Sequence, residues 1–344
     1  MNVLFAKRKN AAITGDTALE KPEKKKTARR TPEEFWQYFK RKAKQPAFWG
    51  VKALRLGMYI LLIGIAFIFL YPFIFMAVTS LKTNSDLLDP TIGWIPRNLR
   101  FANYSMAFAL MSFKTYIWNS LLITGVCTVG HLLSCVFIGY GLARYKFKLR
   151  GILFVLVILT IIIPLQTTMI PSYILFANIK WNDTFLPVFV PTFLGLGLKG
   201  GLFIFLARQT LISMSKEMEE AARIDGCGFL GTYFRIVIPI ARPLMLVILV
   251  LSIVWHWNDY YEPSIYFKQS MQPLSSGIKA LINLSLRTRD ELEQLLGRPV
   301  TDDDIVNTAT VMAGSVMTLT PLMIMFVFLQ KKFVQSVERT GLVE

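Results

Sequence analysis

The chain has 344 residues, of which 53% are hydrophobic and only 17% are charged, and 26 of them are phenylalanine. This composition excludes an ordinary soluble domain, in which about a quarter of the residues carry a charge. The 38 basic and 22 acidic residues leave a formal charge of +16, which in a membrane protein indicates basic cytoplasmic loops near anionic lipid rather than binding to nucleic acid.

Residues 1–57 form a basic extension that we expect to lie in the cytoplasm. Residues 1–30 are polar and lysine-rich, which is typical of disorder. From Thr31, "TPEEFWQYFKRKAK" has a helix cap, a proline at the first helical position and Glu34 three residues after the cap. The sequence therefore predicts an amphipathic helix on the inner membrane surface, with a basic solvated linker as the alternative.

Residues 58–344 contain six apolar segments, each near the length of about 20 residues that crosses a bilayer as a helix. Backbone polar groups must be paired inside lipid, and the alternation of a membrane barrel is absent, so we predict an all-α, polytopic protein with six transmembrane helices. The predicted spans are Met58–Val78, Asn119–Ala143, Ile152–Phe176, Phe189–Ile212, Leu244–Tyr261 and Thr308–Leu329.

The distribution of basic residues predicts that both termini are cytoplasmic. The extension before the first span is rich in lysine and arginine, and six spans return the C-terminus to the same side. The connection "ARYKFKLRG" between the second and third spans must then also be cytoplasmic. It contains four basic residues and no acid, as this orientation requires. We therefore predict a multi-pass protein of a prokaryotic cell membrane.

No residue set predicts a catalytic or metal site. The chain lacks a G-x-x-x-x-G-K-[ST] phosphate loop, and its three cysteines form no C-x-x-C pair. His131 and His256 are each isolated within an apolar run, which favours structural packing over catalysis or metal binding.

Two features are candidates for the path of a transported substrate. Lys199 is expected about 13 Å from the membrane surface, facing either the interior of the bundle or, by extending its stem, the interface. The segment "WHWNDYYEP" mixes aromatic and hydrogen-bonding side chains, which suits a sugar ring, and an interfacial aromatic belt explains it equally. The candidate residues here are Trp257, Asn258, Asp259 and Tyr260.

A charged segment, residues 213–243, interrupts the apolar runs on the predicted cytoplasmic side. Ser213 or Ser215 can cap a helix with an apolar stripe of Met218, Ala221 and Ala222. Gly226 then permits a turn, a second helix follows, and Pro239 and Pro243 redirect the chain into the fifth span. Such a short projecting pair of helices fits a groove on a partner protein, and an ordinary amphipathic surface loop is the alternative.

This segment resembles the EAA loop of permease subunits in binding-protein-dependent ATP-binding cassette importers. The resemblance rests on Glu220-Ala221-Ala222, Gly226 after three further residues, Ile236 after nine more, and Ile238-Pro239. Cys227 departs from the family, which usually has alanine there. The resemblance implies a type I importer permease fold in which a coupling loop at residues 213–243 docks on the ATPase. It assigns that coupling role to Glu220, Ala221, Ala222, Asp225, Gly226, Ile236 and Pro239.

Other stretches, among them "IPLQTTMIPSYIL" and "WNDYYEP", resemble the carbohydrate-uptake group that includes the second permease subunit of the maltose importer. The resemblance implies a second homologous permease, an ATPase dimer and an extracytoplasmic solute-binding protein as partners. It also implies that this chain binds no cofactor and that the ATPase uses ATP-Mg. The cargo is expected to be a sugar or oligosaccharide, with a sugar acid or glycerol phosphate ester as an alternative. A secondary transporter is a further alternative.

Overall fold

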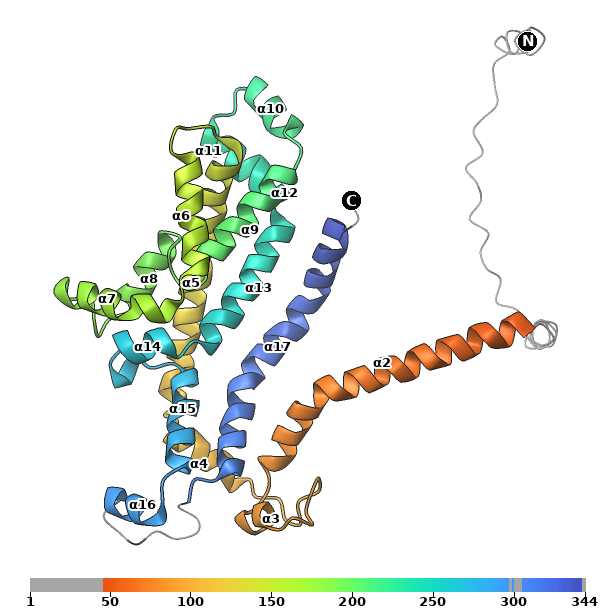
Figure 1. Ribbon diagram of the computed structural model, residues 1–344, viewed down its shortest axis with the longest axis vertical. Coiled ribbons are helices and arrows are strands. Elements are labelled where there is room, and N and C mark those ends of the chain that lie inside the picture. Colours follow the sequence, from red (N-terminus) through yellow and green to blue (C-terminus); the bar gives the residue numbers. More distant parts are fainter. Residues whose placement is uncertain (1–45, 297–298, 300–304, 342–344) are drawn as a thin grey trace. The chain divides into compact units, whose positions relative to one another are not determined.

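A computed structural model describes residues 46–296, 299 and 305–341 (Figure 1). The predicted surface helix from Thr31 and the rest of residues 1–45 lie outside the described residues. The chain divides into two units, Met1–Phe69 and Leu70–Glu344. The regular elements of the described residues are all helices, which confirms the predicted all-α class.

The first helix, α2, spans Pro46–Thr79 and runs without a break through the predicted domain boundary at residues 57 and 58. The helices that follow are α3 (Asn84–Leu88), α4 (Ala102–Leu110), α5 (Phe113–Arg144), α6 (Arg150–Ile162), α7 (Leu165–Asn178), α8 (Leu186–Phe193), α9 (Gly200–Ser213), α10 (Glu217–Ile224), α11 (Phe229–Thr232), a π-helical turn η1 (Tyr233–Val237), α12 (Ile238–Ile240), α13 (Arg242–Asn258), α14 (Tyr261–Tyr266), a 3₁₀ turn η2 (Gln269–Met271), α15 (Leu274–Ser285), α16 (Arg289–Leu296) and α17 (Thr308–Gly341).

Three helices of the described residues are long and apolar enough to cross a membrane: Lys52–Thr79 of α2, the whole of α5 and Thr308–Lys331 of α17. The prediction of a continuous third span, Ile152–Phe176, was wrong, because the chain bends by 105° between α6 and α7. Pro164 lies at this break, where a residue without a backbone N–H cannot continue a helix.

The fourth predicted span, Phe189–Ile212, is also interrupted, since α8 ends at Phe193 and α9 begins at Gly200. Gly195 and Lys199 both have left-handed backbone angles in the connection, with φ of 78° and 64°. The fifth span begins after a bend of 76° and ends at Asn258 rather than Tyr261. In the described part of the chain, at most five spans result if each bent pair is counted as one, so the number six stays a prediction.

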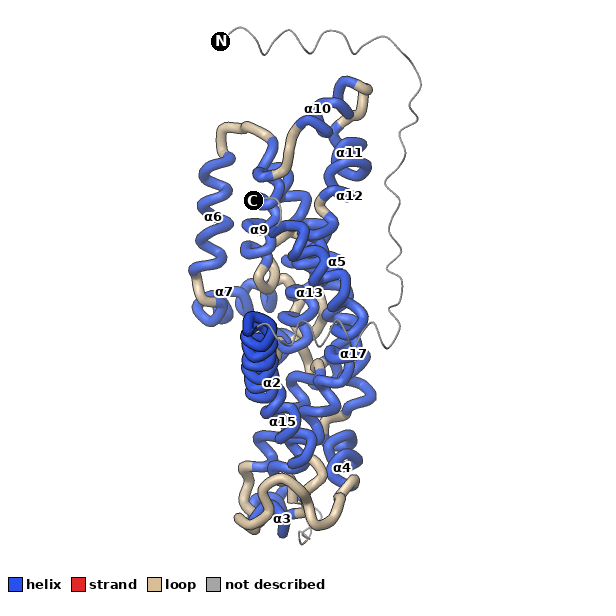
Figure 2. Tube along the Cα trace, turned by 90° about the vertical axis from the view of Figure 1, so that its right-hand side faces the viewer, coloured by secondary structure: helices blue, strands red, loops and turns tan. Residues whose placement is uncertain are grey.

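The centre of the unit Leu70–Glu344 is α5, which packs against α8, α9 and α13. A core cluster joins α5, α9 and α13 through fully buried side chains such as Tyr140, Phe203 and Ile248. A second cluster joins α4, α15 and α17 around Met111, Leu274 and Leu281. The views in Figures 1 and 2 place α10 at one end of this unit and α3 at the other.

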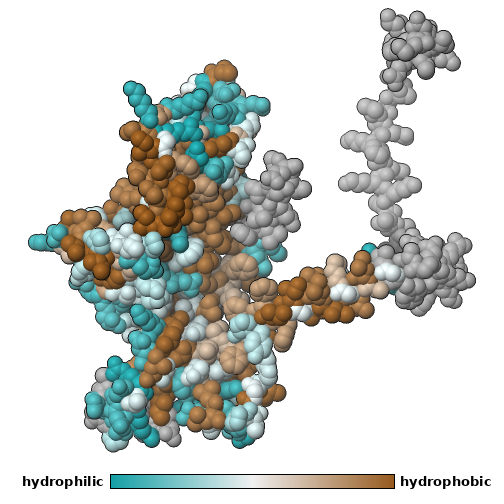
Figure 3. All heavy atoms as spheres, viewed as in Figure 1, coloured by the Kyte–Doolittle hydropathy of each residue, from teal (hydrophilic) through white to brown (hydrophobic). Residues whose placement is uncertain are grey.

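The hydropathy of the surface of this unit changes between the end that carries α10 and the end that carries α3. On the face shown in Figure 3, apolar residues gather over α6 and the helices beside it, and hydrophilic residues gather at the end that carries α10 and near α16 at the other end. No described residue of α6 is buried within the chain. An apolar helix without buried residues is typical of a surface that faces lipid.

The end that carries α3 is held by polar contacts to backbone carbonyls. Lys82 Nζ donates to the carbonyls of Ile92 and Gly93 at 2.9 and 2.8 Å. Asn103 Nδ2 donates to the carbonyls of Ser80 and Lys82, both at 2.9 Å. Buried donors paired in this way give the turn-rich segment after α2 a defined conformation.

The contact between α5 and α9 requires glycine at residue 139. A Cβ atom there would lie 2.5 Å from Ala207 Cβ and 3.0 Å from the backbone nitrogen of Arg208. We expect Gly139→Ala to destabilise the protein by about 1–3 kcal/mol, because the helices must separate. Thermal unfolding in detergent measures this. The control, Gly141→Ala on the same helix, meets no atom within 4 Å and should stabilise by up to about 1 kcal/mol. Equal shifts in the two variants would contradict the prediction.

Candidate functional site

The helix α10 lies within the charged segment 213–243, and its start is stabilised by charge and by a serine. Glu217, Glu219 and Glu220 occupy its first turn, where negative charge is favourable. Ser215 Oγ accepts a hydrogen bond from the backbone N–H of Glu217 at 3.2 Å. The predicted caps Ser213 and Ser215 were wrong, because the N-cap residue of α10 is Lys216, which makes no side-chain capping bond.

Gly226 ends α10 in the way that the sequence predicts. Its φ is 81°, a left-handed value that favours glycine. The N–H of Gly226 donates to the carbonyl of Arg223, and the N–H of Cys227 to that of Ala222, at 3.0 and 2.9 Å. These two bonds form a Schellman motif, which satisfies the last carbonyls of the helix and turns the chain sharply.

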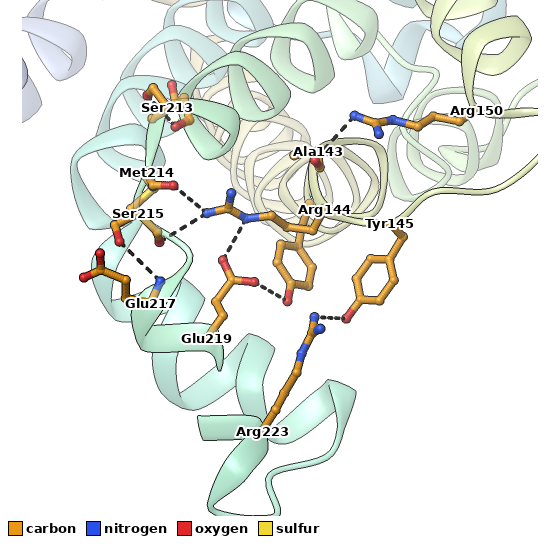
Figure 4. A network of polar contacts seen from close by, with 12 residues as sticks. Ala143, Arg144, Tyr145, Arg150, Ser213, Met214, Ser215, Glu217, Glu219 and Arg223 are labelled. Carbon is orange, nitrogen blue, oxygen red and sulfur yellow. Dashed lines mark hydrogen bonds and ion pairs between the residues drawn. The ribbon is translucent and has the colours of Figure 1, made fainter. Parts of the chain in front are cut away.

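The inner face of α10 is attached to the end of α5 by a buried ion pair (Figure 4). Arg144 Nε donates to Glu219 Oε1 at 2.8 Å, and the side chains are only 3% and 8% exposed. The hydroxyl of Tyr140 donates to Glu219 Oε2 at 3.2 Å, and Arg144 Nη2 donates to the carbonyl of Met214 at 2.9 Å. Each oxygen of Glu219 thus has a donor from α5, and the position of α10 is coupled to that helix.

An aromatic cluster attaches the second half of the segment to the same end of α5. Tyr140 contacts Phe229 and Tyr233 with ring centroids 5.8 and 5.4 Å apart. Phe137 meets Tyr233 edge to face at 5.2 Å, and Tyr145 meets Phe229 at 5.3 Å. Both halves of the segment therefore contact α5, with Tyr140 common to the two sets of contacts.

The outer face of α10 is open and partly apolar. Ile224 is 86% exposed and Met218 is exposed as well, as is Leu230 of the following helix α11. The predicted stripe of Met218, Ala221 and Ala222 is divided, because Ala222 is buried, like Glu219 three residues before it, while Met218 and Ala221 are exposed. Apolar side chains of this size at an exposed helix surface are typical of a protein interface.

The residues to which the resemblance assigns coupling lie mostly on this open face. Glu220, Ala221, Asp225 and Gly226 are exposed, whereas Ala222 is buried. Ile236 in η1 and Pro239 in α12 are half-buried, near the bend into α13. As expected, Pro239 and Pro243 flank the point where the chain turns by 76°. Their coupling role itself stays a prediction.

A depression of about 190 Å³ lies beside α10 and the end of α5. It is lined by Arg144, Lys216, Glu219, Glu220 and Arg223. Arg223 Nη2 donates to the hydroxyl of Tyr145 at 3.4 Å. The lining therefore offers positive and negative side chains to a partner. It extends from the exposed Glu220 to the buried ion pair of Arg144 and Glu219.

Lys199 and the aromatic segment of the fifth span meet in the structure. Lys199 Nζ lies 4.5 Å from the ring centroid of Trp255, and both side chains are exposed within this chain. A non-glycine residue with φ of 64° is uncommon, and such residues are often retained at functional positions. The combination of a cation and an aromatic face suits a polar ligand, and the path role of Lys199 stays a prediction.

The four candidates in "WHWNDYYEP" have different surroundings. Trp257 is buried, and its Nε1 donates to the carbonyl of Thr318 in α17 at 3.1 Å. Asn258 is exposed and donates to the carbonyl of Val254, while Asp259 accepts from the N–H of Tyr261. Tyr260 stacks on Tyr261 with centroids 4.2 Å apart. Burial thus separates Trp257 from Asn258, which is exposed, and from Asp259 and Tyr260, which are half-buried. The path role of all four stays a prediction.

The two histidines, isolated in the sequence, lie together in the structure. His131 of α5 and His256 of α13 are buried and stack with ring centroids 5.2 Å apart. His131 Nδ1 and Ser252 Oγ share a hydrogen bond of 3.0 Å. This contact between helices agrees with the predicted structural packing of the two histidines. The described residues contain no group of three or more His, Cys, Asp and Glu side chains that could hold a metal ion.

Sequence reasoning missed Glu219, Arg144 and Tyr140 as parts of the site. Arg144 was noted only for its positive charge, and Glu219 only as a neighbour of the helical stripe. The signal that could have found Glu219 is the spacing to Ala222, since residues three apart lie on the same helix face. Its partner could not be inferred, because Arg144 is 75 residues away in the chain.

A comparison with protein families finds a match over residues 135–339 to the family described as "Binding-protein-dependent transport system inner membrane component". This range includes the C-terminal end of α5 from residue 135, the whole segment 213–243 and the described part of α17 as far as residue 339. It therefore contains every residue of the ion pair and of the aromatic cluster.

Among curated proteins, the chain is 28% identical to the arabinooligosaccharides transport system permease protein AraQ of Bacillus subtilis, over 83% of this chain and 95% of that protein. It is 30% identical to the melibiose/raffinose/stachyose import permease protein MelC of the same species, over 76% and 87%. A solved structure of a bacterial ABC transporter involved in alginate import has a TM-score of 0.63 at 24% identity, over 83% of this chain and 96% of that one. This last likeness supports the fold.

Proposed function

The chain belongs to the family of binding-protein-dependent transport system inner membrane components, and on this premise we propose that it is one of two permease subunits of an ATP-driven importer of sugars or oligosaccharides. The names of AraQ and MelC, which cover most of the chain, support a carbohydrate cargo. A sugar acid or glycerol phosphate ester is the alternative cargo, which the exposed cation of Lys199 would suit. The binding protein selects the cargo, so a thermal-shift screen of that protein against both classes distinguishes them.

The observation that carries the proposal is the attachment of α10 to α5. One face of α10 is exposed for a partner, and the other is held by Glu219, Arg144 and Tyr140. A force applied to the exposed face therefore acts on a helix of 32 residues that is long and apolar enough to cross the membrane. Mechanical coupling between a docked partner and a membrane helix requires a contiguous packed connection of this kind.

The proposed cycle assigns the chain a purely conformational role. Loaded binding protein docks on the extracytoplasmic loops, and closure of an ATPase dimer around ATP-Mg displaces α10. The displacement passes through the Glu219–Arg144 pair and the aromatic cluster to α5, and the spans open outward. Hydrolysis resets them. In this proposal the chain makes no covalent bond and holds no cofactor, a second permease completes the path, and both termini lie in the cytoplasm.

The test uses the complete importer reconstituted with its binding protein. Glu220→Lys and Gly226→Pro should each lower binding-protein-stimulated ATP hydrolysis by about tenfold, because they alter a surface that a partner must match. Glu217→Lys is the control, since Glu217 is an equally exposed acid of the same helix turn outside the resembling motif. Membrane insertion should be normal in all three. Full stimulation in both motif variants would refute the coupling role.

A further inference from the structure

Two arginines lie at one end of the contact between α6 and α9. Glycine at residue 201 of α9 faces Val157 and Thr160 of α6, and Arg208 of α9 lies over the ring of Phe154, with its Cζ 3.8 Å from the ring centroid. The two helices are therefore antiparallel. Arg150 begins α6 and precedes Phe154 by four residues, so it lies one helical turn further toward the same end.

Within the part of the chain that the structure describes, these two cations have no anionic partner. Neither Arg150 nor Arg208 has an acidic side chain within ion-pair distance there, in contrast to Arg97 with Asp89 and Arg144 with Glu219. The Nε of Arg208 is buried without a hydrogen-bond acceptor, and Arg150 makes only a long contact of 3.4 Å to the carbonyl of Ala143. The two positive charges lie at the same end of the helix pair, and like charges repel each other. An arrangement with free donors and like charges is stabilised by an added anion.

The surroundings indicate where that anion comes from. Large apolar side chains of α6, such as Ile152 and Val155, are exposed within this chain. The two arginines thus lie at one end of the apolar surface that Figure 3 shows over α6. A ligand with a charged head and apolar chains would place its head at the arginines and its chains along α6.

We propose that Arg150 and Arg208 bind the phosphate headgroup of an anionic phospholipid in the cytoplasmic leaflet. The proposal rests on the orientation proposed above, in which the connection between α5 and α6 is cytoplasmic. Each guanidinium offers paired N–H groups that match two phosphate oxygens, and Arg208 is held in place by stacking on Phe154. The lipid would neutralise the repulsion and tie the end of α6 to the end of α9.

The experiment uses the purified importer, equilibrated in mixed micelles of phosphatidylcholine and phosphatidylglycerol, with retained lipid identified by native mass spectrometry. The wild-type complex should retain phosphatidylglycerol selectively. Arg150→Gln with Arg208→Gln should weaken this retention by about 30-fold, or about fivefold for each charge removed. Lys146→Gln with Lys148→Gln is the matched control, because it removes the same charge from exposed residues of the same connection and should leave retention unchanged.

The outcomes separate the lipid from other anions. Unchanged retention in the double arginine variant, or equal retention of phosphatidylcholine by the wild type, overturns the proposal. Displacement of phosphatidylglycerol by excess inorganic phosphate alone would identify a free-phosphate site and would also overturn it. If the double variant does not fold, Arg150→Gln alone should still weaken retention about fivefold. Stimulated ATP hydrolysis in phosphatidylcholine membranes tests the proposed function separately.

Discussion

Replacing Glu219 by lysine is expected to abolish binding-protein-stimulated ATP hydrolysis, with a loss of about a hundredfold or more. The substitution leaves Arg144 without its partner and adds a second buried cation, and breaking a buried ion pair costs about 3–5 kcal/mol. The population in which α10 is held against α5 then falls by at least about a hundredfold. The measurement is the hydrolysis rate of the reconstituted importer with and without loaded binding protein.

Two further variants decide whether the loss of stimulated ATP hydrolysis comes from the buried position of Glu219 or only from the change of charge. Glu217→Lys changes an exposed acid of the same helix turn and should retain stimulation. Arg144→Met combined with Glu219→Leu replaces the pair by apolar side chains of similar size, which often preserves stability. We expect this double variant to recover most of the stimulated rate. If Glu219→Lys is as active as Glu217→Lys, the ion pair does not position α10.

The second large effect is expected at Trp257. Trp257→Ala should lower the free energy of unfolding by about 3–5 kcal/mol, since it removes a buried aromatic side chain from the core between α13 and α17. It also leaves the carbonyl of Thr318 without its Nε1 donor. Thermal unfolding of the purified protein in detergent measures the loss, and Trp257→Phe should show a smaller one because it keeps an aromatic ring.

Trp255→Ala is the matched control for this prediction. Trp255 lies two residues earlier on the same helix, and its side chain is 41% exposed within the chain. Its replacement should change stability by about 0.5 kcal/mol or less. Because Trp255 holds Lys199 Nζ, this variant should instead alter uptake if the two line the path. Equal thermal shifts for the two alanine variants would be incompatible with the burial of Trp257.

Local patterns account for the predictions that the structure confirms. A glycine after a short amphipathic helix predicts a left-handed turn, and Gly226 has φ of 81°. Proline pairs predict a change of direction, and the chain turns by 76° between α12 and α13. Both depend on a few adjacent residues, so no knowledge of the rest of the fold is needed.

The errors have an equally definite cause. The third and fourth spans were expected to be continuous because their composition is apolar throughout, and hydropathy averaged over about 20 residues does not register a single break. Pro164 and the left-handed Gly195 and Lys199 interrupt them. Individual residues therefore indicate where the helices break, but the angle of each bend depends on the helices against which the two parts pack.

The helical class, the location in a membrane and the position of the segment 213–243 follow from composition, charge and helical period, which are properties of neighbouring residues. The contacts of Glu219 with Arg144, of His131 with His256 and of Lys199 with Trp255 depend on the packing of the folded chain. These partners are far apart in the chain. Their contact depends on how whole helices pack, and a periodic pattern shows which residues share a face but not which helix that face meets.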